Sequence, residues 1–140
     1  MMDYLSDHFT LEEMTRSKTA SEKHIDNTPP EAAVRNLKIL CTQVLEPARA
    51  KYGRPIVITS GYRCAKLNTA VGGVLKSYHT KGMAADIRID NLKDAYNLAK
   101  LLNDRPLTDL VLIEHSTTAQ WLHVQWSRYP RHRVNFDYKV

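Results

Sequence analysis

Two histidines and an aspartate in the second half of the chain have the residue types and the setting of a metal site. His79 precedes Asp86 by seven residues, with Gly82 between them to let the chain turn, and His123 lies between two apolar strand residues. Two imidazoles and one carboxylate suit Zn²⁺ and leave the fourth tetrahedral position open for water, as in catalytic sites. The three residues therefore predict a catalytic zinc site. Taken singly, each also fits a plainer role, as a solvent-facing or hydrogen-bonded strand histidine or as a turn cap.

Glu114 is the candidate general base for such a site. Alternation within the stretch Asp109–His115 puts Glu114 on the same strand face as Leu112. If Thr117–Gln120 forms a four-residue hairpin loop, Glu114 lies directly across from His123. A carboxylate in that place can take a proton from a zinc-bound water. The alternative is an exposed charge that ends the strand.

Two helices and four strands are predicted around these residues. Apolar residues recur every three or four positions over Glu31–Tyr52, and Gly53 fits a helix stop. Asn91–Asn103 predicts a second helix, with Asn91 and Asp94 as a capping pair. Short β-branched or alternating stretches predict four strands, at Ile56–Thr59, Ala84–Ile89, Asp109–His115 and Trp121–Trp126.

The remaining stretches carry weaker patterns. Thr10–Thr15 predicts a short helix that Thr10 and Glu13 cap, whereas Thr19–Pro30 and Tyr62–Lys81 are typical of loops, and Arg128–Val140 has no clear period. The order of the elements predicts one α+β domain over residues 1–140, a small, largely antiparallel central sheet flanked by helices.

Length and composition fit an ordinary globular domain. The 140 residues are 43% hydrophobic and 25% charged, which argues against disorder. The longest unbroken apolar run is Leu110–Ile113, so we expect no transmembrane helix and no membrane insertion. Met1–Thr10 lacks the apolar core of a signal peptide, which predicts cytoplasmic synthesis. Cys41 and Cys64 have no CxxC spacing and are expected to be reduced, with Cys41 in the core; a disulfide between them is the alternative.

The net charge of +5 fits an anionic partner, which includes nucleic acid, a cell-wall polymer and a membrane surface. Basic and aromatic residues alternate over Arg128–Val140, as they do in some nucleic-acid-binding patches. Packed aromatics with solvated charges explain the same composition, and we expect no nucleic-acid partner.

Several motifs together resemble one family of enzymes. Ser77–Asp86, with the sequence SYHTKGMAAD, resembles the SxHxxGxAxD signature of the zinc D-Ala-D-Ala carboxypeptidases and the related bacteriophage peptidoglycan endopeptidases. Ser60–Arg63 with the downstream Asn68 and Val71–Gly73, Leu112–Glu114, and Trp121–Val124 look like further motifs of that family. Phe9–Met14 is similar to its phage and prophage branch.

The resemblance implies a role for six residues. His79, Asp86 and His123 would bind one Zn²⁺ per chain, Arg63 would face the substrate carboxylate or the developing oxyanion, and Ser77 would hydrogen-bond near the site. Glu114 would be the base. Carboxypeptidase branches have a glutamate three residues before the last histidine, where this chain has Gln120. Because glutamine cannot accept a proton, either Glu114 is the base or the protein is inactive.

The resemblance therefore implies a zinc metallopeptidase that hydrolyses peptidoglycan stem peptides or cross-bridges, either as an endolysin-like endopeptidase or as a D-Ala-D-Ala carboxypeptidase. Such an enzyme would be a monomer that acts on the cell wall after release from the cytoplasm. The alternative is a catalytically inactive, zinc-containing wall-binding domain.

Overall fold

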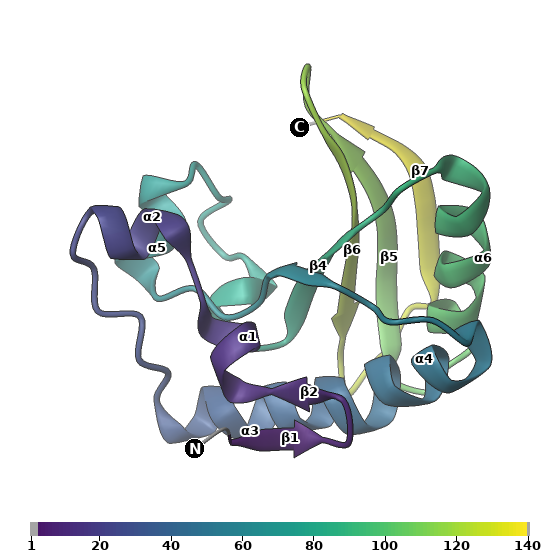
Figure 1. Ribbon diagram of the computed structural model, residues 1–140, viewed down its shortest axis with the longest axis horizontal. Helices are drawn as coiled ribbons and strands as arrows, with labels where there is room; N and C mark the ends of the chain where they lie inside the picture. Colours follow the sequence, from purple (N-terminus) through teal and green to yellow (C-terminus); the bar gives the residue numbers. More distant parts are fainter. Residues whose placement is uncertain (1–2, 140) are drawn as a thin grey trace.

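The computed structural model describes residues 3–139 as an α+β fold built on a five-stranded sheet (Figure 1). The strands are ordered β3-β4-β6-β5-β7, and every pairing is antiparallel except that of β5 with β7. Their bounds are β3 Ile58–Ser60, β4 Ala84–Arg88, β5 Thr108–His115, β6 Gln120–Trp126 and β7 Arg133–Lys139. The predicted fold class is confirmed. The predicted strands are found within two residues of their expected starts.

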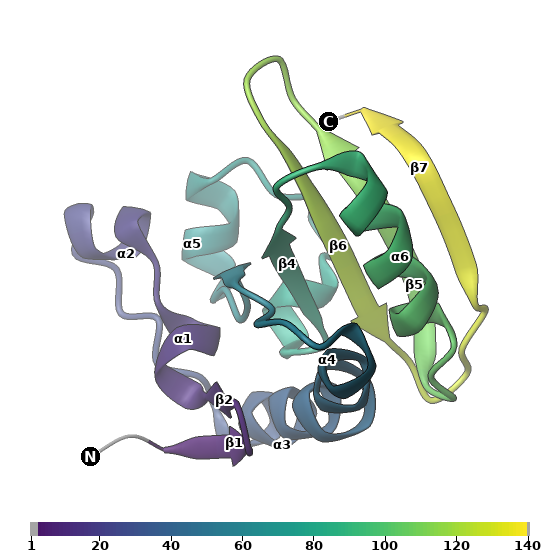
Figure 2. The ribbon, with the colours of Figure 1, turned by 45° about the vertical axis from the view of Figure 1, so that its right-hand side comes forward.

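Helices cover one face of this sheet and bury its apolar side chains. They are α3 (Glu31–Ile39), a π-helical segment (Leu40–Leu45), α4 (Glu46–Tyr52) and α6 (Leu92–Asn103). Figure 2 shows α6 lying along the sheet beside β5, while the helix from α3 to α4 passes below. Val111 and Ile113 of β5, with Leu122 and Val124 of β6, join the core on this face. Because strand residues alternate, Leu112, Glu114 and His123 face the other side.

The first predicted helix is continuous in its course, but its middle turn is a π-helix. Pro47 has no backbone N–H, so in an α-helix the carbonyl of Gln43 would lose its partner. Arg105 Nε donates to that carbonyl instead, at 2.9 Å. The backbone widens just before the proline, where Glu46 N bonds to Cys41 O. Gly53 ends α4 in the left-handed conformation, as predicted, with φ 75°.

The short elements beyond the sheet and its covering helices were only partly predicted. The helix α1 (Leu11–Thr15) is confirmed with its cap, in which Thr10 and Glu13 exchange side-chain to backbone hydrogen bonds. The loops predicted at Thr19–Pro30 and Tyr62–Lys81 are wrong in part, because they contain short helices. These are α2 (Lys18–Glu22) and α5 (Ala65–Ala70), with a 3₁₀ turn at Tyr78–Lys81. Helices of five or six residues leave no periodicity to detect.

Three further strands had no counterpart in the prediction. The strands β1 (Tyr4–Ser6) and β2 (Phe9–Thr10) form a small antiparallel sheet of their own. β7, in the stretch without clear period, adds a parallel edge strand beside β5. Cys41 is buried and Cys64 is partly exposed, and neither forms a disulfide, as predicted. Within residues 3–139, no helix has the length and apolar character needed to cross a membrane.

Candidate metal centre

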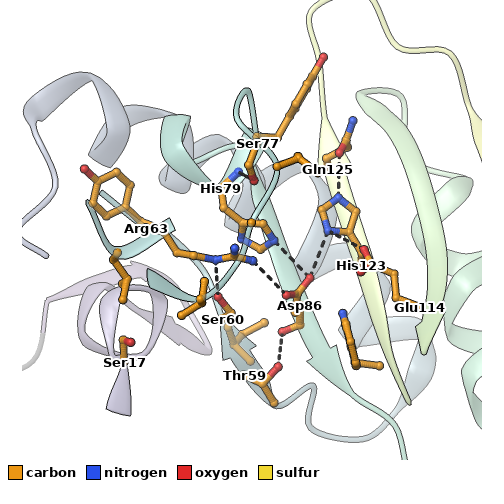
Figure 3. Close-up of a pocket in the computed structure, with 18 of the residues that line it drawn as sticks. Ser17, Thr59, Ser60, Arg63, Ser77, His79, Asp86, Glu114, His123 and Gln125 are labelled. Carbon is orange, nitrogen blue, oxygen red and sulfur yellow. Dashed lines mark hydrogen bonds and ion pairs between the residues drawn. The ribbon is translucent and has the colours of Figure 1, made fainter. Parts of the chain in front are cut away.

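His79, Asp86 and His123 come from three separate elements and meet on the open face of the sheet (Figure 3). His79 lies in the 3₁₀ turn, while Asp86 of β4 and His123 of β6 are direct partners in the sheet register. Their nearest ligand atoms all lie within 4.8 Å of one another. Asp86 Oδ1 is 3.2 Å from His79 Nε2 and 3.1 Å from His123 Nδ1. The structure thus brings the three predicted residues to one point.

A backbone carbonyl orients the ring of His79. Nδ1 lies 2.7 Å from the carbonyl oxygen of Gly61, which can only accept, so Nδ1 donates and Nε2 keeps its lone pair toward Asp86. Ser77 fixes the turn itself, because its Oγ accepts from the backbone N of His79 at 3.1 Å. Gly61 packs so closely on α1 that a Cβ there would overlap the carbonyl of Met14.

His123 is oriented through its other nitrogen. Its Nε2 lies 2.7 Å from Oε1 of Gln125, so Nδ1 is free to point toward Asp86. The sequence prediction assigns Gln125 no role, although its position two residues from His123 along one strand places both side chains on the same face. Both imidazoles therefore use one nitrogen for a protein oxygen and aim the other at the shared point, as metal-binding histidines do.

The donor set and its charges fit a divalent zinc ion. The Asp86 side chain is 12% exposed. Burial acts to raise the pKa of Asp86, but the two neighbouring imidazoles outweigh it and hold the pKa well below its usual range. Burial lowers the pKa of His79 and favours its neutral form. Burial also acts to lower the pKa of His123, but the hydrogen bond and charge of Asp86 outweigh it and raise that pKa. Because metal binds an ionised carboxylate and neutral imidazoles, His123 must release a proton when the metal binds.

Glu114 lies beside this cluster, but in a different register from the predicted one. It pairs with Trp121, and His123 pairs with Leu112. The prediction that Glu114 lies directly opposite His123 is therefore wrong. The loop begins at Ser116 rather than Thr117, with Ser116 N bonded to Ala119 O. This shifts the register by two residues, which preserves the face of each strand.

The two-residue shift still leaves Glu114 within reach of the cluster. Its Oε1 is 3.6 Å from Nδ1 of His123. Burial raises the pKa of Glu114, with a further increase from the charge of Asp86. A carboxylate whose proton affinity is raised in this way is better suited to take up and return a proton. Gln120, by contrast, is exposed and does not line the cavity that Glu114 lines.

Arg63 lies on the opposite side of Asp86 and is held by three neighbours. Its Nε donates to Ser60 Oγ at 3.2 Å and its Nη1 to Asn68 Oδ1 at 3.0 Å, while Nη2 lies 3.5 Å from Asp86 Oδ2. A Cβ on Gly73 would overlap the amide of Asn68, so this clamp requires a glycine. Burial lowers the pKa of Arg63, and the charges of Asp86 and Glu114 oppose that change.

The cluster lies in a cleft of about 1690 Å³ between the sheet and the segment that carries α2 and α5. His79, Asp86, Glu114 and His123 line it, as do Arg63 and Ser77. Further basic side chains around the cleft are Arg16, Lys18, Lys76 and Arg133. The cleft is large enough for an extended peptide, and its basic residues suit a substrate with carboxylates.

Comparison with known proteins agrees with this geometry. No curated protein matches the chain significantly. A family model described as Peptidase M15 matches residues 7–125, a range that includes all six predicted site residues. Peptidases of this family depend on zinc, and the His-Asp-His cluster fits such a site. Because the match covers most of the 140 residues, the chain belongs to the Peptidase M15 family.

Proposed function

We propose that this peptidase hydrolyses peptide bonds in the stem peptides or cross-bridges of peptidoglycan, with one Zn²⁺ bound by His79, Asp86 and His123. The observation that carries the proposal is the convergence of two imidazole nitrogens and a carboxylate oxygen in an open cleft, with Glu114 beside them. Within residues 3–139 the cluster has three members and all three line the cleft, which suits a catalytic site with a fourth position open to water.

The side chains around the cluster have distinct tasks in this reaction. A bound Zn²⁺ would lower the pKa of the attacking water and would polarise the scissile carbonyl. Glu114 takes the proton of the attacking water and returns it to the leaving amine. Arg63, on the other side of Asp86, pairs with a substrate carboxylate or with the developing oxyanion. Ser77 lines the cleft and fixes the turn that carries His79; a direct contact with substrate stays a prediction.

The charge of the cleft supports a wall peptide as substrate. Peptidoglycan stem peptides carry free carboxylates, and the basic residues around the cleft attract them at long range. We infer that the protein reaches this substrate as a monomer after release from the cytoplasm. Salt should slow the association, since it screens exposed charges.

A catalytically inactive wall-binding domain is the second candidate, because Gln120 occupies the position of the usual base. Gln120 is exposed and does not line the cleft, which weakens the case that the substitution at this position decides activity. The position of Glu114, with its Oε1 3.6 Å from Nδ1 of His123, supports Glu114 as the base of an active enzyme.

The test is digestion of purified cell walls and defined muropeptides, with products identified by mass spectrometry and zinc measured in the same samples. We expect about one zinc per chain and new free termini, abolished by a chelator and restored by added zinc. Loss of a terminal D-alanine identifies a carboxypeptidase, and separation of cross-linked peptides identifies an endopeptidase. Wall binding with bound zinc but unchanged muropeptides would establish the second candidate instead.

A further inference from the structure

A chain of hydrogen bonds leads from His123 to the segment that follows β6. Gln125 accepts from His123 Nε2 and donates through its own Nε2 to Oδ2 of Asp109, at 3.0 Å. Asp109 also accepts from Arg131, whose backbone N and Nε lie 2.9 Å from Oδ1 and whose Nη2 lies 2.8 Å from Oδ2. The side chains of Gln125 and Asp109 are buried, so water does not compete for these bonds.

The charge of Asp109 sets the direction of every bond in this chain. The hydrogen bond from Arg131 lowers the pKa of Asp109 to about 2, so its carboxylate is ionised and only accepts. The amide nitrogen of Gln125 must therefore face Asp109, and the amide oxygen must face His123. Since that oxygen also only accepts, Nε2 of His123 carries a hydrogen. In the neutral ring, Nδ1 then holds the lone pair.

A β-bulge makes this contact possible. In a regular strand, Asp109 would face away from its neighbour Leu110, which lines the cleft. The register of β5 against β6 shifts between Thr108 and Leu110, at the level of Gln125. Bulges of this kind re-aim a side chain, and here the irregularity brings a carboxylate to the amide that contacts a candidate metal ligand.

We propose that Gln125 is a positioning residue for metal binding: fixed by Asp109 and Arg131, it holds His123 in the tautomer whose Nδ1 points at the metal. The inference rests on the proposed zinc site. It assigns roles to three residues that bind neither metal nor substrate. Gln125 and Asp109 lie within the range matched by the family model, whereas Arg131 lies beyond its end.

The first measurement is the zinc dissociation constant, obtained by competition with a chromophoric chelator. Gln125→Met keeps the length of the side chain but cannot accept from Nε2, and we expect it to weaken zinc binding about 10- to 100-fold. Asp109→Asn and Arg131→Ala should weaken binding in the same direction by less, because they loosen the amide without removing it. Arg128→Ala is the matched control: it removes an exposed arginine from the same segment and should leave the constant unchanged.

The second measurement is the protonation of the His123 ring, read from ¹⁵N-edited NMR spectra of the zinc-loaded protein. We expect a slowly exchanging hydrogen on Nε2 and metal on Nδ1 in the wild type, with faster exchange in Gln125→Met. A purely structural role for Gln125 would lower the melting temperature of the metal-free protein without changing the zinc constant or this exchange. If Gln125→Met fails to fold, Arg131→Ala carries the test, since its side chain is about half exposed, at 49%.

The outcomes separate this inference from the proposed function. Wild-type protein that binds zinc, together with variants that bind it equally well, would overturn the inference alone. Metal found on Nε2 of His123 would overturn it as well. Wild-type protein that binds no zinc would overturn both.

Discussion

Glu114 approaches His123 diagonally across the β5–β6 hairpin, with its Oε1 3.6 Å from Nδ1, although the two residues are not register partners. One hairpin thus positions both a candidate ligand and the candidate base. Their separation is set by backbone hydrogen bonds rather than by a flexible loop, which is the rigid support that catalytic geometry requires.

Glu114→Gln should abolish most wall hydrolysis while zinc stays bound. The amide has nearly the size of the carboxylate but cannot take a proton, and the loss of a positioned general base costs about 10²–10⁴-fold in rate. The measurement is the rate of muropeptide cleavage with zinc content determined in the same sample.

Gln120→Ala is the control for that substitution, because Gln120 lies on the same hairpin but does not line the cleft. It should leave the rate nearly unchanged. If Glu114→Gln kept more than about a tenth of the activity, Glu114 would not be the general base, because that loss is smaller than base removal causes.

His123→Ala should lose zinc. Removal of one of three protein ligands leaves two donors and an open site, so the metal content after gentle purification should fall far below one per chain. His115→Ala, which changes a histidine of the same hairpin outside the cleft lining, should keep the full content. Equal zinc in the two variants, by elemental analysis, would contradict the assigned ligand set.

Asp109 should make the stability of the metal-free protein depend on pH. Its pKa is about 2, against an ordinary value of 3.8, so the folded state favours the ionised form. A carboxylate with a lowered pKa stabilises the folded state at pH values above its unfolded-state pKa, and this stabilisation is lost as the pH falls through the folded-state pKa. For Asp109 the contribution is about 2 kcal/mol, and about half of it is lost by pH 3.

Urea unfolding of the wild type and of Asp109→Asn, both with a chelator present, measures this contribution. The wild type should be more stable at pH 7, and the difference should shrink between pH 4 and pH 2. A difference that stays constant over that range would mean that Asp109 does not titrate as an ion pair with Arg131.

The two cysteines should react at very different rates. Cys41 is buried, and burial raises the pKa of its thiol far above the usual range, which removes the reactive thiolate. Cys64 is partly exposed. A thiol reagent at pH 8 should therefore modify one thiol quickly in the native protein and two in urea, and Cys64→Ser should remove the fast phase. Two fast thiols in the native wild type would contradict the buried position of Cys41.

The parts of the fold that could be predicted are those with a local cause. Helix α6 begins where Asn91 caps it, and in strand β4 Ala85 and Ile87 join the core while Asp86 lines the cleft, as alternation predicts. The register of the β5–β6 hairpin depends on where its loop begins, and Ser116 and Ala119 decide that through a backbone bond that composition does not reveal. β7 pairs with β5 in parallel, a long-range contact without a local pattern.

The candidate site, too, has features that the sequence reveals and features that only the folded chain creates. The grouping of His79, Asp86 and His123 could be predicted from motif spacing and strand alternation, which are both visible in the sequence. The contact of Asp109 with Gln125 could not, since it depends on a bulge that reverses the expected facing of one side chain. The pairing of Asp109 with Arg131 spans 22 residues and arises only when the chain after β6 folds back.

The contact between Gly61 and Met14 links the N-terminal region to the metal centre. Tyr62 N bonds to Met14 O at 2.7 Å, so the backbone that carries Gly61 rests directly on helix α1. The carbonyl of Gly61 in turn accepts from Nδ1 of His79, which leaves Nε2 directed at Asp86. Helix α1 thus contributes no residue to the cluster but supports the backbone that orients His79. A change in α1 would consequently be felt first at the backbone of Gly61 and the ring of His79, which it supports, rather than at the strand pairings of the sheet.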